Sequence, residues 1–346
     1  MQNETHIINA KENNTWNKFL DQIPKNKKDV YYHANYANLY NNKICKAKCF
    51  VYKSKENIFF YPFIKRNILN TNYYDSITPY GYGGPIIKFN DKNFLIEALN
   101  SYSSYLKENN IICEQIKFHP LLKNYKIFQE IKTHKIYSAC KTVTVDCQLK
   151  PEFMWSNIYK KSNKEKIKKI QKKNAKVFFS KDIKAMLKFT EIYNENLKSI
   201  NAEKKYFFDL NYFNSISNNL NQNFFIAHLE IEGEILASQI VIYGTNFGHT
   251  HLQGTSPKGK KLGVTNLLKH EVIMRAKKLN LQYLNFGGGR TNDKDDSLLQ
   301  FKSGFSSTFS EFYLGEKIYR NDLYQELTNN LEKKKFFSYR NDNFIS

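Results

Sequence analysis

Hydrophobic and polar residues follow two different periods within residues 223–290. Three short runs rich in β-branched and aromatic residues are separated by turns that contain glycine; they are residues 223–231, 235–244 and 249–256. This pattern predicts an antiparallel β-meander. Residues 264–280 instead space their apolar side chains as on one face of a helix, and the apolar run 281–286 ends at three glycines. We therefore expect strands, then a helix, then a buried strand.

The same order of elements occurs in the first half of the chain. Residues 48–53 and 57–66 predict a hairpin, and residues 77–87 predict a strand and a loop. Residues 92–110 have the spacing of an amphipathic helix, and the run 111–120 reads as a strand. The repeated order predicts two copies of one α/β unit. Because Lys150-Pro151 interrupts the pattern, we expect domains at 1–150 and 151–325 and a polar C-terminal tail at 326–346.

Composition supports two globular domains and excludes several other classes. The chain has 346 residues, of which 41% are hydrophobic, enough for a substantial core. No apolar run approaches the roughly 20 residues that a transmembrane helix needs, and the polar N-terminus does not resemble a signal peptide. The five cysteines include no CxxC pair, so we expect reduced thiols and no metal site. A cytoplasmic location follows as the expectation.

The charge balance favours an anionic partner. The formal net charge is +21, and the chain has 48 Lys but only 5 Arg. Residues 160–176 contain nine Lys and allow a helix that places Lys160, Lys164 and Lys168 on one face. In one interpretation this is an ordinary solvated surface helix, whose many lysines reflect the lysine-rich composition of the whole chain. Alternatively, the face docks phosphates. Both interpretations remain open from the sequence.

Two further segments carry candidate chemistry. Residues 256–263 form a Gly/Lys loop before the predicted helix at 264–280, where backbone N–H groups would bind an anion. His251 lies on the same strand face as two other polar side chains and is either a general base or an ordinary strand histidine. A short helix is predicted just after the glycines at 287–289, with Ser297 as its N-cap, and it carries Lys302.

Several segments together resemble a known family. The meander–helix–strand unit at 223–290 resembles the GNAT acyltransferase fold. From Thr15 to Tyr319 the chain resembles the Fem-type aminoacyltransferases of peptidoglycan bridge formation and their double-GNAT relatives. The segments that carry this resemblance are TWNKFLDQIP with DVYYHANYANLY, the loop Tyr80-Gly81-Tyr82-Gly83-Gly84-Pro85, the Lys-rich run 160–176, and LNFGGG with LLQFKSGFSSTFSEFYLG.

The resemblance implies an α+β fold of two tandem GNAT-like domains, with mixed, largely antiparallel sheets. It also implies transfer of an aminoacyl or acyl group to an amine, which needs no covalent nucleophile. Lys302 would point into the transfer site, where it would hold the oxyanion or a phosphate of the donor, with His251 as a second catalytic residue. The donor-binding residues would be Lys160, Lys164, Lys168, Lys260, Lys261 and Gly263. The acceptor-binding residues, on the first domain, would be Lys65, Arg66, Tyr80, Tyr82, Gly83 and Gly84.

The resemblance further implies substrates from the cell envelope. Aminoacyl-tRNA is the favoured donor and acyl-CoA the other, with no tightly bound cofactor. The acceptor would be a nucleotide- or lipid-linked precursor of peptidoglycan or a surface glycan, reached from the cytoplasm or peripherally at the inner membrane.

Two other hypotheses remain open. The first is an acyl-CoA-dependent N-acyltransferase that acts on a nucleotide-linked amino sugar. The second is a non-catalytic RNA-binding protein that uses the Lys-rich helix, although the sequence contains no recognisable RNA-binding module. Assays with coenzyme A thioesters and with charged tRNA separate the two donors. RNA binding that survives the loss of Lys302 would favour the non-catalytic hypothesis.

Overall fold

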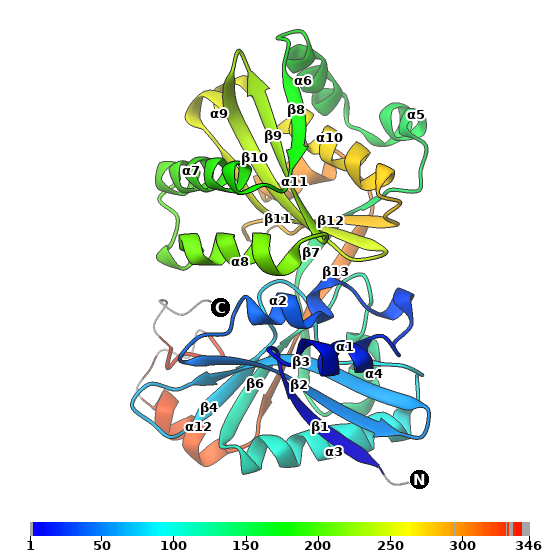
Figure 1. The fold of residues 1–346 in the computed structure, drawn as a ribbon, viewed down its shortest axis with the longest axis vertical. Coiled ribbons are helices and arrows are strands. Elements are labelled where there is room, and N and C mark those ends of the chain that lie inside the picture. Colours follow the sequence, from blue (N-terminus) through cyan, green and yellow to red (C-terminus); the bar gives the residue numbers. More distant parts are fainter. Residues whose placement is uncertain (1–2, 292, 294, 330, 332–334, 341–346) are drawn as a thin grey trace. The chain divides into compact units, whose positions relative to one another are not determined.

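The computed structural model describes residues 3–291, 293, 295–329, 331 and 335–340, and it divides into two compact units (Figure 1). Unit 2 is Cys140–Glu311, and unit 1 consists of the described parts of Met1–Ala139 and Phe312–Ser346. The chain leaves unit 1 within β7 (Lys135–Asp146) and returns within β13 (Phe309–Ile318).

This division differs from the predicted domains 1–150 and 151–325 and from the predicted tail at 326–346. The physical reason is strand pairing and packing. Residues 314–318 of β13 pair with β6 (Ile111–Lys117) of unit 1. Three aromatic residues of the expected tail, Phe336, Phe337 and Tyr339, pack against a small buried cluster around Ile112. The segment after residue 311 therefore completes the first unit rather than following the second.

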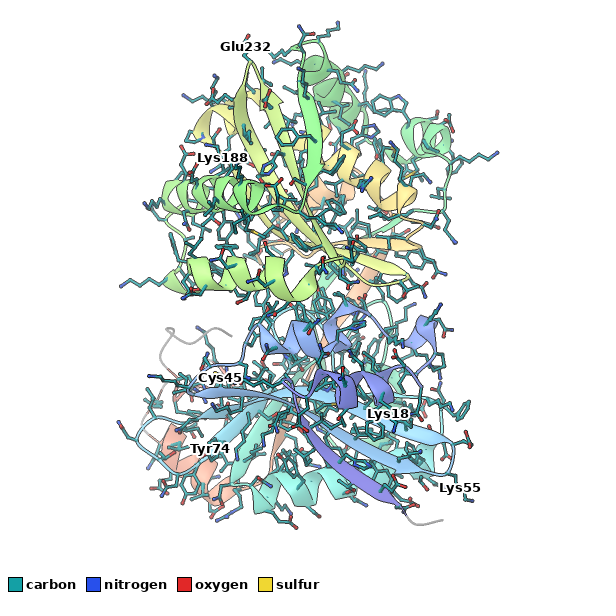
Figure 2. All side chains as sticks on the ribbon, in the orientation of Figure 1. Lys18, Cys45, Lys55, Tyr74, Lys188 and Glu232 are labelled. Carbon is teal, nitrogen blue, oxygen red and sulfur yellow. The ribbon has the colours of Figure 1, made fainter. Side chains whose placement is uncertain are left out.

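Unit 1 is built on a mixed sheet with the strand order β1-β2-β3-β4-β6-β13. The further strands are β1 (Glu4–Asn9), β2 (Cys45–Ser54), β3 (Asn57–Asn67), β4 (Tyr74–Ile77) and β5 (Ile86–Ile87), which pairs with β3. The helices are α1 (Asn13–Leu20), α2 (Ala34–Asn38), α3 (Lys92–Glu108), α4 (Tyr125–Ile131) and α12 (Asn321–Thr328). The predicted hairpin is β2–β3, whose turn contains Lys55 (Figure 2).

Strand β3 explains why unit 1 has helices on both sides of its sheet. Successive side chains of a strand face opposite sides, and nearly every residue of β3 is buried. On one side Phe60 packs against Trp16 of α1. On the other, Tyr61 and Phe63 pack against Tyr102 of α3. A continuous apolar strand of this kind requires cover on both faces.

Unit 2 repeats this architecture with the strand order β8-β9-β10-β11-β12-β7. Its strands are β8 (Lys176–Ser180), β9 (Phe224–Ile231), β10 (Glu234–Tyr243), β11 (Phe247–Thr255) and β12 (Tyr283–Gly287), together with the part of β7 from residue 140. The helices are α5 (Pro151–Phe153), α6 (Lys161–Gln171), α7 (Ile183–Ser199), α8 (Leu210–Leu220), α9 (Pro257–Leu262), α10 (Thr265–Lys278) and α11 (Ser297–Ser303). Glu232, labelled in Figure 2, lies in the turn of the hairpin β9–β10.

The two units share one connection that a meander alone would not have. In unit 1, α3 lies between β4 and β6, which pair in parallel. In unit 2, α10 lies between β11 and β12, which also pair in parallel. A parallel pair needs a crossover, and in both units that crossover contains the predicted amphipathic helix. The predicted α+β fold of two similar units is confirmed.

Candidate functional site

A cavity of about 560 Å³ lies within unit 2, and we call it the unit 2 pocket. Residues of β10, β11, α10, β12 and α11 line it. Its volume is in the usual range for small-molecule sites. Four of the predicted site residues line this pocket, namely His251, Lys260, Gly263 and Lys302. The structure therefore brings both predicted catalytic residues together with part of the predicted donor-binding set.

The lining of the unit 2 pocket is cationic. Its basic side chains are Lys260, Lys269, Arg290 and Lys302, and none of the described lining residues is acidic. The buried amide oxygens of Gln239 and Asn266 have no hydrogen-bond partner among the described residues. An unpaired buried oxygen is costly unless a ligand or water satisfies it. The pocket therefore suits an anionic ligand that also carries hydrogen-bond donors.

One carboxylate fixes the start of α11, and it is Asp296 rather than the predicted Ser297. Asp296 Oδ1 accepts from the backbone N–H of Leu299 at 2.8 Å, and Oδ2 accepts from that of Arg290 at 2.9 Å. A Cβ on Gly289 would lie 2.4 Å from Asp296 Oδ1, so only glycine permits this approach. The hydrogen bonds lower the pKa of Asp296 to about 2. The helix is thereby attached to the glycine turn after β12.

Lys302 is held over this glycine turn. Its Nζ donates to the carbonyl oxygen of Gly288 at 2.6 Å. Burial lowers the pKa of Lys302 to about 8, while the negative charge of Asp296 acts in the opposite direction. Desolvation disfavours the ammonium form, but a pKa of about 8 leaves that form in the majority at neutral pH. Lys302 thus supplies a positioned, partly desolvated positive charge.

His251 is better suited to hydrogen bonding than to proton abstraction. Its Nε2 lies 2.7 Å from the hydroxyl of Tyr212, which comes from α8. Burial, followed by the neighbouring His249, lowers the pKa of His251 to about 3. A general base works best with a pKa near the working pH. The geometry therefore favours a neutral imidazole that orients a partner.

Lys269 is a functional candidate that our sequence interpretation missed. Its residue surface is only 3% exposed, and its Nζ lies 4.8 Å from the ring centroid of Phe286. Burial, and then the charge of Lys302, holds the pKa of Lys269 well below its usual value. The signal was present in the sequence, because Lys269 precedes Val272 and Ile273 by three and four positions on the apolar face of α10. A lysine on such a face is rarely buried without a reason.

The predicted anion-binding loop at 256–263 has a different structure. Residues 257–262 form α9, which Ser256 caps by accepting from the N–H of Gly259 at 3.1 Å. Gly263 ends this helix with a φ of 76°, and α10 begins two residues later. The pocket lining includes Gly263 and the first turn of α10, so a helix N-terminus still faces the pocket. Lys260 lines the pocket, whereas Lys261 is exposed and does not.

The predicted Lys-rich helix is α6, and it has the expected thin apolar stripe of Ile167 and Ile170. Lys160 precedes the helix, and its Nζ lies 3.3 Å from Ser303 Oγ at the end of α11. Lys164 and Lys168 follow on the solvent side, and none of these three lysines lines the unit 2 pocket. The helix therefore adjoins the element that carries Lys302 without contributing to the cavity itself.

The two basic residues predicted to bind the acceptor in unit 1 have different surroundings. They are adjacent on β3, so their side chains point to opposite faces. The Nζ of Lys65 lies 3.8 Å from the ring centroid of Tyr74. Arg66 is buried, and its Nε donates to Asp75 Oδ1 at 2.7 Å. Arg66 therefore belongs to a buried ion pair, and the role of both residues in binding the acceptor stays a prediction.

The glycine-rich loop of unit 1 is packed rather than open. A Cβ on Gly83 would lie 2.6 Å from Thr78, and one on Gly84, whose φ is 77°, would lie 2.9 Å from Ile116. The carbonyl of Gly83 accepts from Asn124 at 2.8 Å. These glycines therefore have a structural role, whatever the loop contacts.

The two tyrosines of that loop are half-buried. The ring of Tyr82 packs against Tyr31, His119 and Phe312, and the backbone carbonyl of Tyr80 accepts from the hydroxyl of Tyr36 at 2.6 Å. The loop is thus fixed from several sides. Tyr80 and Tyr82 stay proposals as acceptor-binding residues.

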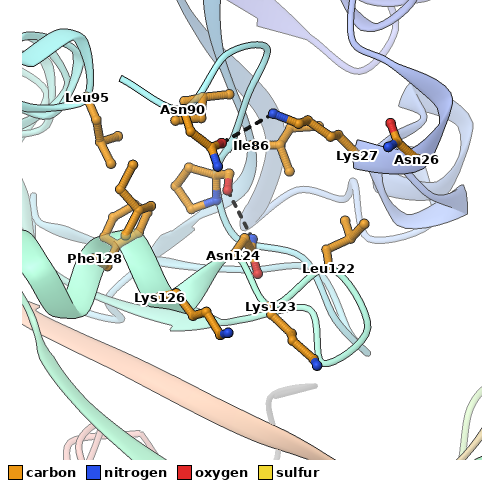
Figure 3. Close-up of a pocket in the computed structure, with 13 residues that line it drawn as sticks. Asn26, Lys27, Ile86, Asn90, Leu95, Leu122, Lys123, Asn124, Lys126 and Phe128 are labelled. Carbon is orange, nitrogen blue, oxygen red and sulfur yellow. Dashed lines mark hydrogen bonds between the residues drawn. The ribbon is translucent and has the colours of Figure 1, made fainter. Parts of the chain in front are cut away.

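Unit 1 has a second cavity, of about 350 Å³, which none of the predicted site residues lines. Its walls are apolar where β5, α3 and α4 meet, and its charged side chains are Lys27, Lys123 and Lys126 (Figure 3). The Nζ of Lys27 already donates to the carbonyl of Lys88 at 3.0 Å and to Asn90 at 3.2 Å. The other two lysines are exposed. The unit 2 pocket, with its buried and unpaired polar groups, is therefore the stronger candidate.

Comparison with known proteins agrees with this choice. The family model described as an acetyltransferase (GNAT) domain matches residues 167–295. That stretch includes most of the residues that line the unit 2 pocket. Residues 167–295 are thus a GNAT-type acyltransferase domain, and the chain as a whole has a double-GNAT fold. The predicted class, an acyl- or aminoacyltransferase, is confirmed. No curated protein matches the sequence.

Solved structures are similar to the chain over almost its full length. FemX shares 13% identity with a TM-score of 0.75, and the match covers 94% of this chain and 99% of FemX. The C-terminal domain of a protein assigned as a lysylphosphatidylglycerol synthetase, from Agrobacterium fabrum, shares 12% identity over 91% of this chain and 93% of that chain, with a TM-score of 0.58. A tandem GNAT protein from the clavulanic acid biosynthesis pathway shares 7% identity over 91% and 98%, with a TM-score of 0.54.

At these identities the likeness concerns the fold. It confirms the predicted resemblance to the Fem-type, double-GNAT architecture. Among the described residues, no helix has both the length and the apolar character to cross a bilayer.

Proposed function

We propose that the protein transfers an aminoacyl or acyl group to an amine, with the chemistry in the unit 2 pocket. The observation that carries the proposal is Lys302, a half-buried ammonium whose Nζ donates to the carbonyl oxygen of Gly288 at 2.6 Å. None of the described residues that line its pocket is acidic. The GNAT domain match over the same unit supports it.

The reaction needs few groups. An amine attacks the carbonyl carbon of an ester or thioester, and negative charge develops on the carbonyl oxygen. A positioned cation stabilises that charge more in the transition state than in the bound substrates. Lys302 would meet this need, and His251 with Tyr212 would orient the reacting groups through hydrogen bonds. Holding both reactants in line supplies much of the remaining rate enhancement.

We favour aminoacyl-tRNA as the donor. Phosphates of tRNA would contact Lys260 at the pocket. Lys160, just before α6, and Lys164 and Lys168 within α6 would extend this contact, because Lys160 adjoins α11. The similarity of the fold to FemX and to a lysylphosphatidylglycerol synthetase domain supports aminoacyl transfer. Acyl-CoA is the alternative donor, favoured by the GNAT domain match and by the helix N-terminus at the pocket.

We further propose that the acceptor is an amine of a nucleotide- or lipid-linked precursor of peptidoglycan or a surface glycan. Unit 1 would bind it through Tyr80, Tyr82 and Lys65, and the reaction would take place in the cytoplasm or at the inner membrane surface. An amino sugar linked to a nucleotide is the alternative acceptor and goes with the acyl-CoA donor.

The decisive experiment supplies both donors separately. The protein is incubated with acetyl-CoA or with a mixture of charged tRNAs, in each case with a nucleotide-linked amino sugar and with a nucleotide-linked muropeptide. Mass spectrometry then detects the amide product. Product from one donor that disappears in Lys302→Met supports the proposal. The proposal is contradicted if no combination of substrates gives product while tRNA still binds, with the same affinity in Lys302→Met. That result would favour a non-catalytic RNA-binding protein.

A further inference from the structure

Amide formation requires a group that removes a proton from the attacking amine, and the unit 2 pocket limits the choice. None of the described lining residues is an aspartate or glutamate. His251 has a pKa of about 3 and already contacts Tyr212. Lys302 and Arg290 are cations at neutral pH. Lys260 is exposed, and its Nζ donates to Ser199 Oγ at 2.6 Å. One titratable side chain remains with a different environment, and it is Lys269.

The surroundings of Lys269 disfavour a positive charge. Its side chain comes from α10 and is buried, with the Nζ over the ring of Phe286 of β12. The charged or titratable groups that line the same pocket are Lys302 of α11, Lys260 of α9, Arg290 after β12 and His251 of β11. None of them can pair with an ammonium. The ring face of Phe286 attracts an ammonium weakly, but burial without a counter-charge, followed by the charge of Lys302, depresses the pKa of Lys269 and favours the neutral amine.

Lys302 differs from Lys269 although both lysines line the pocket. Lys302 donates to the carbonyl of Gly288, and Asp296 at the start of its own helix favours its charged form. No hydrogen bond of Lys269 to a described residue offers the same support. Two neighbouring groups whose environments separate their protonation states are the usual sign of an acid–base pair.

We propose that the Lys269 amine is the general base of the unit 2 pocket, taking the proton of the attacking amine while the Lys302 ammonium faces the carbonyl oxygen. This inference rests on the proposed function and assigns a catalytic residue to it.

The lone pair of the acceptor nitrogen forms the C–N bond, and Lys269 Nζ takes a proton from that nitrogen. The tetrahedral intermediate collapses as the C–O bond of an ester, or the C–S bond of a thioester, breaks. The leaving oxygen or sulfur then takes the proton from the Lys269 ammonium. The products are an amide and a free hydroxyl or thiol, and Lys269 is neutral again.

The test compares Lys269→Ala with Lys278→Ala, which changes an exposed lysine at the end of α10 outside the pocket. Both variants and the wild type are assayed between pH 5 and 9 with the donor that gives product, and thermal melting confirms that they fold. We expect Lys269→Ala to lose about 10²- to 10⁴-fold in turnover, as is typical for a general base. The wild-type decline in turnover on the acid side should disappear in this variant. Added ethylamine should restore part of the turnover, with mass spectrometry showing that the product amine is unchanged.

A second measurement does not depend on the substrate. In protein labelled with ¹³C at the lysine ε-carbon, the resonance lost in Lys269→Met identifies Lys269, and its titration is followed directly. We expect the pKa of Lys269 to lie well below the usual lysine value.

The outcomes separate the two proposals. If the wild type transfers the group and Lys269→Ala keeps the same decline in turnover at acid pH, the assignment of Lys269 as the base is overturned, but the proposed function is not. An ordinary lysine pKa for Lys269 would have the same consequence. No transfer by the wild type from either donor overturns the proposed function and the catalytic role with it.

Discussion

The ammonium of Lys302 donates to the carbonyl oxygen of Gly288 at 2.6 Å, so a side chain from α11 is fixed to the turn that follows β12. An ammonium has three N–H donors. Within the described residues this bond uses one of them, and the other two are available to a ligand in the pocket. The ammonium of Lys302 is therefore held in place and can still donate hydrogen bonds to a ligand.

Removing this charge should impair catalysis rather than folding. We expect Lys302→Met to lower turnover by about 10²- to 10³-fold, the usual loss for one oxyanion donor. The melting temperature should change little, because methionine keeps most of the side-chain volume. Lys302→Arg should recover only part of the turnover, since the planar guanidinium places its charge elsewhere. Retention of more than about a tenth of wild-type turnover in Lys302→Met contradicts the assignment.

The pH dependence of turnover should report Lys302 on the alkaline side. Its pKa is about 8, lowered by burial, so the charged form is lost as the pH rises through that value. We therefore expect turnover to fall above about pH 8. In Lys302→Arg this decline should move beyond the measurable range, because arginine stays charged. An alkaline limb that is identical in both proteins would show that another group titrates.

Stability should show the cost of burying Lys269. Because its pKa is depressed in the folded state, the unfolded chain binds more protons, and the wild type loses stability as the pH falls from about 10. Lys269→Met removes this term. We expect its melting temperature at pH 7 to exceed that of the wild type, with the gain shrinking as the pH approaches 10. Lys261→Met should show no such pH-dependent gain.

The donor can be identified from salt dependence. If tRNA binds along α6, its affinity should fall by about 0.7–0.9 log units per log unit of salt for each phosphate contacted. Replacing Lys160, Lys164 and Lys168 by glutamine should reduce that slope. Glutamine at three exposed lysines of unit 1, Lys18, Lys55 and Lys92, is the matched control and should leave it unchanged. A donor affinity indifferent to salt and to both triple variants points to coenzyme A instead.

Two glycines with nearly the same φ allow the cost of backbone strain to be distinguished from the cost of steric contact. Gly84 has a φ of 77° and Gly263 a φ of 76°, but only Gly84 has atoms within 4 Å of an added Cβ. Gly263→Ala should cost about 1–2 kcal/mol from the left-handed conformation alone. Gly84→Ala should cost clearly more, because Ile116 must also move. Chemical denaturation measures both, and equal losses would show that packing at Gly84 is unimportant.

Much of the fold could be predicted from the sequence because it is local. The hairpin β2–β3 and the helices α3 and α10 follow from hydrophobic period and turn residues. The division into units could not be predicted in this way. It depends on the pairing of β13 with β6, which are almost two hundred residues apart, and no local pattern encodes that partner.

The candidate site was predictable only in part. Lys302 and His251 were found from motif position and strand alternation, and both line the unit 2 pocket. The ion pair of Arg66 could not be predicted, because a sequence does not show that Asp75 lies opposite it on the neighbouring strand. Lys269 was missed because the sequence of a lysine-rich chain does not distinguish one lysine from the others until its burial is known.

The insertion of unit 2 within unit 1 has a consequence for synthesis on the ribosome. Unit 2 has all of its residues once position 311 has been made, whereas unit 1 still lacks the segment that begins at residue 312. Unit 1 begins earlier but finishes later: Asp75, fully buried, accepts from Arg66 and also from Arg340 at 2.6 Å. Until Arg340 emerges, that carboxylate lacks one of its two cationic partners. The half of the protein that is translated first is therefore the half that is completed last.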